Sequence, residues 1–247
     1  MINPLKSPLE ERLKSWHGEL WHTAKGRMIR DVVYAIDTGL VTTVSFLAGA
    51  SVSFAAREKV IVAGLIQAVS GTLAIFFGSY ISTKAQKHFF ENQIERERKE
   101  IEDDPLKETL EIREIFADMG FDAGEQEIAV RRITRNKDVW LKFMAQEEIG
   151  IVPGSIDNPF EIAFISAASF ILGAVPAILP FFLFSDVSRA LSISVFFVLS
   201  FLFLLGIVKS RITKAHWLSS GVETLFFGSL SCAAGFFLGK IVSGYFH

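Results

Sequence analysis

The hydrophobic residues of this chain gather into long runs that carry little charge. A bilayer core is crossed by a helix of about 20 apolar residues. Five stretches reach that length, at residues 32–55, 60–83, 162–185, 189–208 and 218–243. Short polar turns join the first stretch to the second and the third to the fourth. The pattern therefore predicts an all-α membrane protein with five transmembrane helices.

A long polar insert separates the second predicted helix from the third. Seventeen of the 27 acidic residues lie between Lys84 and Glu148, against twelve Lys and Arg. Anionic headgroups attract basic segments, so concentrated acid suits the collection of a cation better than membrane attachment. We therefore divide the chain into an amphipathic amino-terminal segment (1–30), transmembrane helices 1 and 2 (31–83), an acidic helical metal-binding domain (84–160) and transmembrane helices 3 to 5 (161–247).

Composition narrows the class of protein. Half of the 247 residues are hydrophobic, and 24 are Phe, which is too apolar for a soluble domain of this size. The lone Cys232 rules out a disulfide within the chain and a cysteine zinc cluster. Because the sequence has no nucleotide-binding loop, catalytic triad or histidine zinc motif, we expect neither an enzyme nor a nucleic-acid partner. The expected partners are the lipid bilayer, metal ions and protons.

Orientation follows from Lys and Arg near the ends of the predicted helices. Eight lie on the side of the amino terminus and the insert, and four on the opposite side. This excess places the amino terminus and the insert in the cytoplasm. Five crossings then leave the carboxyl terminus outside the cell or in a lumen.

Two pairs of glutamates in the insert are spaced i,i+3, so each pair shares one helix face. The pairs are Glu97 with Glu100 and Glu108 with Glu111. Between them, Asp103-Asp104-Pro105 predicts the end of one helix and a capped start of the next, because residues before proline avoid the α region and proline favours the first helical position. If the helices fold back, four carboxylates converge to bind Fe²⁺, Mn²⁺ or a similar ion. The alternative is a solvated pair of charged helices.

The segment 138–151 adds a second candidate element. Trp140, Phe143 and Ile149 can form the apolar face of a short helix, while Met144 and Glu148, spaced i,i+4, project together from another face. A thioether would shift the metal preference toward softer ions.

Within the apolar runs, Asp37 is the acidic residue set well inside. Burying such a charge costs about 2.5–3.5 kcal/mol on insertion scales, which makes it a functional candidate. The alternative is a hydrated position near the interface, since Asp31 is close by. Gln67 adds a polar group in the second run, and Gly64, Gly71 and Gly78 there predict close helix packing.

Several segments together resemble the vacuolar iron transporter (VIT) family, in the family's order over most of the chain. They are RDVVYAIDTGLVTTVSFLAGAS (30–51), GSYISTKAQ (78–86), WLKFMAQEEIGI (140–151), SFILGAVPAILPF (169–181) and GIVKSRIT (206–213). The resemblance implies a five-span homodimer that exchanges cytoplasmic Fe²⁺, often also Mn²⁺, for protons. It also implies a cytoplasmic helical metal-binding domain between helices 2 and 3.

The resemblance also implies site residues. The family's metal-binding glutamates are spaced three, eight and three and are followed by Met-Met-x-x-Glu, which here corresponds to Glu97, Glu100, Glu108, Glu111, Met144 and Glu148, with Ala145 in place of the second Met. The family's transport carboxylate in helix 1 falls on Thr38, one residue after Asp37. Its helix-2 Glu falls on Gln67, and its Met at the membrane mouth falls on Ile75. One residue turns a helical side chain by about 100°.

We therefore expect a divalent metal transporter for Fe²⁺, possibly Mn²⁺, with proton-coupled export from the cytoplasm. The metal would be collected by the glutamate-rich domain, which could hold Fe²⁺, Mn²⁺ or Zn²⁺. Because Gln cannot exchange a proton as Glu does, coupling would depend on Asp37. The alternative is a non-transporting membrane sensor, buffer or interaction protein with a degenerate conduit.

Overall fold

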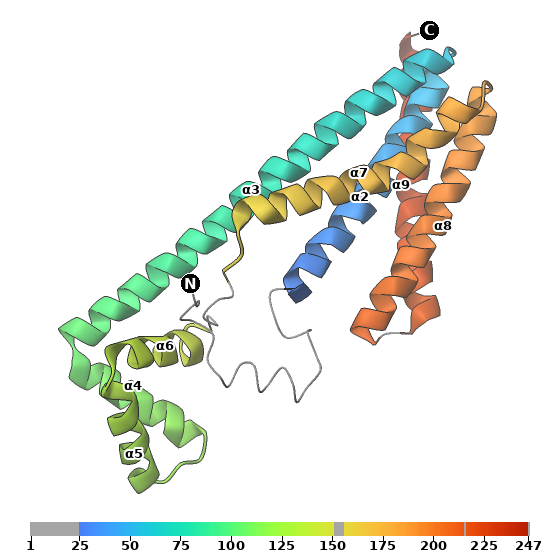
Figure 1. Cartoon of the computed structure of the whole chain (residues 1–247). Coiled ribbons are helices and arrows are strands. Elements are labelled where there is room, and N and C mark those ends of the chain that lie inside the picture. The colour runs from blue at the N-terminus through green and yellow to red at the C-terminus, as the bar shows by residue number, and fades with distance from the viewer. Residues whose placement is uncertain (1–24, 151–155, 215, 247) are drawn as a thin grey trace, which may run out of the picture. The chain divides into compact units, whose positions relative to one another are not determined.

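The computed structural model describes residues 25–150, 156–214 and 216–246, and every regular element in these ranges is a helix (Figure 1). The all-α prediction is confirmed for this part of the chain. The expected amino-terminal segment lies mostly outside the described residues. The helices are α2 (Lys25–Ser53), α3 (Arg57–Asp103), α4 (Pro105–Asp118), α5 (Ala123–Thr134), α6 (Lys137–Glu147), α7 (Pro159–Leu183), α8 (Val187–Thr213) and α9 (Trp217–Phe246).

Five of these helices, α2, α3, α7, α8 and α9, are long and apolar enough to cross a membrane, as predicted. The chain is therefore an integral membrane protein. Helix α2 begins at Lys25, before the apolar run, and α3 continues past residue 83 to Asp103. Polar residues can extend a helix beyond the bilayer because the backbone hydrogen bonds of a helix are internal.

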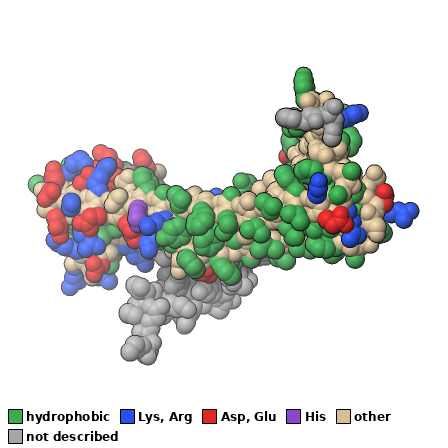
Figure 2. All heavy atoms as spheres, turned by 90° about the horizontal axis from the view of Figure 1, so that it is seen from above, with side chains coloured by type: hydrophobic (Ala, Val, Ile, Leu, Met, Phe, Trp, Pro, Cys, Tyr) green, Lys and Arg blue, Asp and Glu red, His purple; other side chains and the backbone are tan. Residues whose placement is uncertain are grey.

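The chain divides into two compact units. One contains the described residues up to Tyr80 together with those from Phe160 onward, and the other contains the described residues between Ile81 and Pro159. Hydrophobic side chains cover much of the apolar helices, whereas charged side chains gather on the insert (Figure 2). This contrast matches a membrane unit and a water-exposed unit.

In the membrane unit, α2 packs against α8 and α9, and it also crosses α7 at very short range. A methyl group on Gly39 would lie 2.3 Å from the carbonyl oxygen of Phe170, and one on Gly173 would lie 2.3 Å from that of Ile36. Small residues permit this close approach of two backbones, which replaces the missing hydrophobic force between helices in lipid. Phe170 and Phe181 fill the core beside the crossing.

Two of the three glycines in α3 pack closely against side chains of other helices in the same chain. A methyl group on Gly64 would meet the side chain of Leu47, and one on Gly71 would meet the ring of Phe170. Gly78 has nothing within 4 Å. Close helix packing was predicted for these glycines, and α2 and α7 are the partners of the first two.

In the second unit, local capping sets the helix boundaries. Helix α3 ends at Asp103, the Asp104 side chain accepts a hydrogen bond from the Lys107 amide, and Pro105 opens α4. The predicted break is confirmed. Such a cap stabilises a helix by about 1 kcal/mol. Asp122 begins α5 with a capping box, and Asn136 caps α6. The core of this unit is formed by Ile101, Ile112, Val130, Trp140 and Met144.

Candidate metal centre

Three carboxylates from three helices meet in the second unit. Glu97 comes from α3, Glu108 from the first turn of α4, and Glu148 from the residue that ends α6. One oxygen of each lies within 4.8 Å of the other two. The break at Asp104 makes this possible, because it turns the chain back so that residues on either side of it face one another. Three oxygens at this separation form a set that can hold a divalent cation.

Two of these carboxylates are buried. Glu97 is 3% exposed and Glu108 is 1% exposed, whereas Glu148 lies at the surface. Oε1 of Glu97 and Oε2 of Glu108 have no hydrogen-bond partner among the described residues. An unpaired buried carboxylate oxygen is costly, so it calls for a compensating proton or cation.

Burial and mutual repulsion raise the pKa values of the three clustered carboxylates. Burial, followed by repulsion from Glu148 and Glu108, raises the pKa of Glu97 to about 8. Burial also raises the pKa of Glu108 and of Glu148, with further repulsion from Glu111 in both cases. With its pKa raised to about 8, Glu97 is protonated at neutral pH. A cation would replace this proton.

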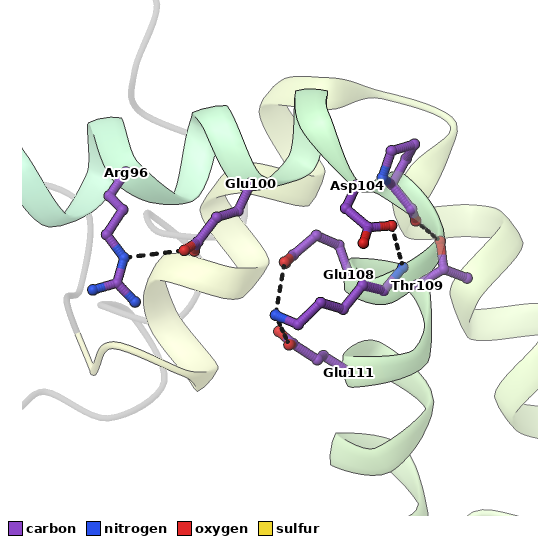
Figure 3. Close-up of polar contacts among 8 residues, drawn as sticks. Arg96, Glu100, Asp104, Glu108, Thr109 and Glu111 are labelled. Atoms are coloured by element: carbon purple, nitrogen blue, oxygen red, sulfur yellow. Dashed lines mark hydrogen bonds and ion pairs between the residues drawn. The ribbon is translucent and has the colours of Figure 1, made fainter.

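Glu100 and Glu111 lie at the margin of the cluster, each paired with a cation of its own helix (Figure 3). Glu100 accepts from Arg96 at 3.1 Å, and Glu111 is 2.9 Å from the Lys107 ammonium. Lys107 also lies 3.9 Å from Glu108, so it already supplies part of the positive charge. The structure brings Glu97, Glu108 and Glu148 together most closely, whereas Glu100 and Glu111 form ion pairs with Arg96 and Lys107.

Met144 is fully buried and belongs to the same core cluster as Trp140. The expectation that Met144 and Trp140 would lie on separate faces is wrong, because residues spaced i,i+4 share one face of a helix, and both pack into the same core. Glu148 follows the last turn of α6, one turn beyond Met144, and its amide donates to the Met144 carbonyl. The role of the Met144 sulfur as a ligand stays a prediction.

In the membrane unit, Gln67 is held by two threonines of α2. Its amide oxygen accepts from Thr43 at 3.1 Å, and its amide nitrogen donates to Thr42 at 3.3 Å. The Thr38 hydroxyl donates to the Tyr34 carbonyl, and Ile75 packs against the core. The contact between α2 and α3 at this level is therefore polar but uncharged.

Asp37 lies elsewhere on α2, where it lines a cavity of about 650 Å³ between α2, α8 and α9. Lys209 and Glu223 line the same cavity, and the Lys209 ammonium is 3.4 Å from a carboxylate oxygen of Glu223. The positive charge of Lys209 also attracts the carboxylate of Asp37. Sequence reasoning missed this grouping, because α8 and α9 are distant from α2 in the chain. The signal in the sequence was a pair of opposite charges, Lys209 at the end of the fourth apolar run and Glu223 near the start of the fifth.

The fold and the cluster together define a five-helix integral membrane protein that carries a buried carboxylate site in a helical insert. Comparison with known sequences is consistent with that class. A sequence model of the VIT family matches residues 29–240. The chain is 30% identical to vacuolar iron transporter 1 of Arabidopsis thaliana over 235 residues, covering 95% of this chain and 94% of that protein.

Two further relatives show how far the likeness extends. Vacuolar iron transporter 1 of Oryza sativa subsp. japonica is 29% identical over 90% of this chain and 88% of its own length. Protein CCC1 of Saccharomyces cerevisiae is 22% identical over 87% of this chain and 69% of its own length. The chain belongs to the VIT family, as its sequence motifs indicated.

Proposed function

We propose that this protein moves a divalent metal ion, Fe²⁺ foremost and Mn²⁺ as a second substrate, out of the cytoplasm, and that the insert collects the ion. The observation that carries the proposal is the meeting of Glu97, Glu108 and Glu148 within 4.8 Å, with two buried oxygens that lack a partner. The names of the relatives, which are vacuolar iron transporters, support Fe²⁺ as the first substrate.

The chemistry of capture follows from the donors. Carboxylate oxygens favour hard and intermediate divalent ions, so Fe²⁺, Mn²⁺ and Zn²⁺ are all candidates. Glu100 and Glu111 complete the set when the ion draws them from Arg96 and Lys107, and Met144 supplies a thioether. Because the pKa of Glu97 is raised to about 8, this side chain is protonated at neutral pH, and binding a cation would release that proton.

Passage through the membrane would use the polar contact of α2 and α3. Gln67, with Thr38 and Ile75 along the same helices, would line this conduit, and Asp37 would exchange the proton from the neighbouring cavity. We place the insert and the amino terminus in the cytoplasm and the carboxyl terminus outside or in a lumen. We further propose a homodimer, which would cover exposed apolar residues of α3 such as Val62, Ile66, Val69 and Leu73.

A second candidate is a membrane-bound metal sensor or buffer that does not transport. The hydrogen bonds of Gln67 favour it, because an amide satisfied by two hydroxyl groups neither carries charge nor releases a proton. In this case the carboxylate cluster would bind metal and the membrane helices would serve as an anchor.

Metal uptake into proteoliposomes separates the two candidates. The full-length protein should accumulate Fe²⁺ and Mn²⁺ faster than protein-free vesicles, and a pH gradient should increase the rate. The variant carrying Glu97→Gln and Glu108→Gln should lose most of this uptake. Metal binding without uptake by the wild type, at any pH gradient, would favour the sensor or buffer.

A further inference from the structure

Helix α8 ends and α9 begins at the end of the membrane unit where α2 begins (Figure 1). A basic hollow lies between these two helix ends. Its volume is about 800 Å³. The lining consists of two apolar or aromatic residues, one hydroxyl and three basic groups: Ile207, Ser210, Arg211, Lys214, His216 and Trp217. It therefore combines positive charge with apolar surface, and none of the described residues that line it is acidic.

Within the described ranges, acidic side chains do not pair with the two strongest cations of this hollow. Neither Arg211 nor Lys214 forms an ion pair with an acidic residue in the described part of the chain. Other cations at the same end are paired, since Arg30 lies 2.9 Å from Asp31 and Lys209 lies 3.4 Å from Glu223. Arg211 and Lys214 are both exposed, so their charges remain available to an external anion.

The backbone adds to this positive field. Helix α9 begins at Trp217 and has no acidic residue in its first turn. The amino-terminal end of a helix carries partial positive charge and favours anions. Lys214 adopts a φ of 54°, a left-handed conformation in which glycine is the usual residue at the end of a helix. Lys214 therefore occupies a position at which its backbone is strained.

The apolar part of the hollow identifies the kind of anion. The Trp217 side chain is half exposed, with its ring 6.3 Å from that of His216, and Ile207 lies beside the cations. Tryptophan at the end of a membrane helix lies at headgroup level. A free phosphate would use only the cations, whereas a phospholipid would also use the apolar and aromatic surfaces. Basic pockets between membrane helices bind anionic headgroups.

We propose that the hollow at the turn between α8 and α9 is a binding site for an anionic phospholipid, whose phosphodiester group lies between Arg211 and Lys214 and whose glycerol and upper acyl region pack on Ile207 and Trp217. The site is separate from the carboxylate cluster and from the cavity of Asp37. It does not rest on metal transport.

Native mass spectrometry of the full-length protein tests this site. The protein in detergent is offered equal amounts of phosphatidylglycerol and phosphatidylcholine, which differ in net charge but share the phosphodiester group. Phosphatidylglycerol should be retained at least fivefold in excess. The variant with Arg211→Gln and Lys214→Gln should lose this excess. The matched control carries Arg57→Gln and Lys59→Gln at the turn between α2 and α3, where Glu58 accompanies the cations, and should keep it.

A second variant guards against misfolding. Lys214→Gly removes one cation and suits the left-handed backbone, so it should fold at least as well as the wild type and still lower phosphatidylglycerol retention. Equal retention of the two lipids by the wild type would overturn the proposal. So would an equal loss in the Arg57 and Lys59 control. Complete displacement of phosphatidylglycerol by millimolar inorganic phosphate would show a free-anion site and would also overturn it.

Discussion

A carboxylate oxygen of Glu97 lies within 4.8 Å of one of Glu108, although Glu97 belongs to α3 and Glu108 to the first turn of α4, on the other side of the Asp104–Pro105 break. Both side chains are buried, so neither can remain charged at low cost without a partner. The pair therefore reports on whether the insert holds a proton or a cation.

Replacing one member of this pair should weaken metal binding. Glu97→Gln replaces a buried carboxylate of the cluster with an uncharged amide. The affinity of the full-length protein for Mn²⁺ should therefore fall at least tenfold, as measured by calorimetry in detergent. Glu102→Gln is the matched control, since Glu102 pairs with Lys137. Equal Mn²⁺ affinities in the wild type, Glu97→Gln and Glu102→Gln would show that the cluster is a group of charged side chains without a role in metal binding.

The stability of the metal-free insert should depend on pH through Glu97. Its pKa rises from an ordinary 4.5 to about 8, so the folded chain holds this proton more tightly than the unfolded chain does. The stabilisation is complete below about pH 4.5 and is lost as the pH rises toward about 8. Hydrogen exchange in residues 97–148 should therefore be slower at pH 6 than at pH 8.5 after correction for the intrinsic rate.

Two comparisons make this test specific. Mn²⁺ should restore slow exchange at pH 8.5, because the ion replaces the proton. Glu97→Gln should remove most of the pH dependence, since the amide does not titrate. A pH dependence that is unchanged in Glu97→Gln would assign the effect to another group.

Lys107 should compete with a metal ion for the same oxygens. Its ammonium is 2.9 Å from Glu111 and 3.9 Å from Glu108. Lys107→Gln should release Glu111 toward the cluster and raise Mn²⁺ affinity about threefold or more at low ionic strength, where charge effects are least screened. Lys137→Gln, which removes the partner of Glu102, should leave the affinity unchanged. A weaker affinity in Lys107→Gln would make Lys107 a positioning residue instead.

Much of this arrangement could be predicted from the sequence. The break at Asp104 depends on proline and aspartate acting locally, and the membrane helices depend on the length of apolar runs, so both follow from short windows. The selection of Glu97, Glu108 and Glu148 over Glu100 and Glu111 could not be predicted. It depends on which turns of α3, α4 and α6 face inward, and that is decided by packing around Met144 and Ile112.

The position of Asp37 shows the same limit in the membrane unit. Its offset of one residue from the family position predicted a turn of about 100°, and α2 continues through it as a regular helix. What Asp37 meets there depends on the tertiary packing of α8 and α9. The glycines of α3 likewise predicted close packing, while the partners Leu47 and Phe170 required the structure.

Asp37 should be needed for proton movement if metal exchange uses its cavity. Asp37→Asn should abolish metal-driven proton movement in proteoliposomes containing a pH-sensitive dye, and Mn²⁺ binding by the insert should remain. Asp31→Asn is the control, since Asp31 pairs with the adjacent Arg30 at the start of α2. Full proton movement in Asp37→Asn would exclude this residue from coupling.

Restoring an acid at position 67 should change the pH response. Gln67→Glu places a titratable group between Thr42 and Thr43, so uptake should become faster or more steeply dependent on pH. Gln67→Leu supplies the control without an acid. If the wild type does not transport and Gln67→Glu combined with Ile75→Met fails to rescue uptake, the protein is a binding module.

The crossing of α2 and α7 should tolerate no side chain at Gly173. A methyl group there would lie 2.3 Å from the Ile36 carbonyl oxygen, so Gly173→Ala should lower the melting temperature in detergent or prevent recovery of monodisperse protein. Gly78→Ala adds the same methyl group to a membrane helix at a site with nothing within 4 Å, and it should be neutral. Equal behaviour of the two variants would contradict the close crossing.

The break at Asp104 makes the insert sensitive to length as well as to composition. The eight-residue interval from Glu100 to Glu108 includes the break between two helices, because α3 ends at Asp103 and α4 starts at Pro105. One residue added within α4 before Glu108 would rotate that carboxylate by about 100°, away from Glu97. One residue added after Asp118, in the connection to α5, would leave all of these oxygens in register. The length of the connection between α4 and α5 can therefore change without moving Glu108 relative to Glu97, whereas the number of residues between these two glutamates cannot.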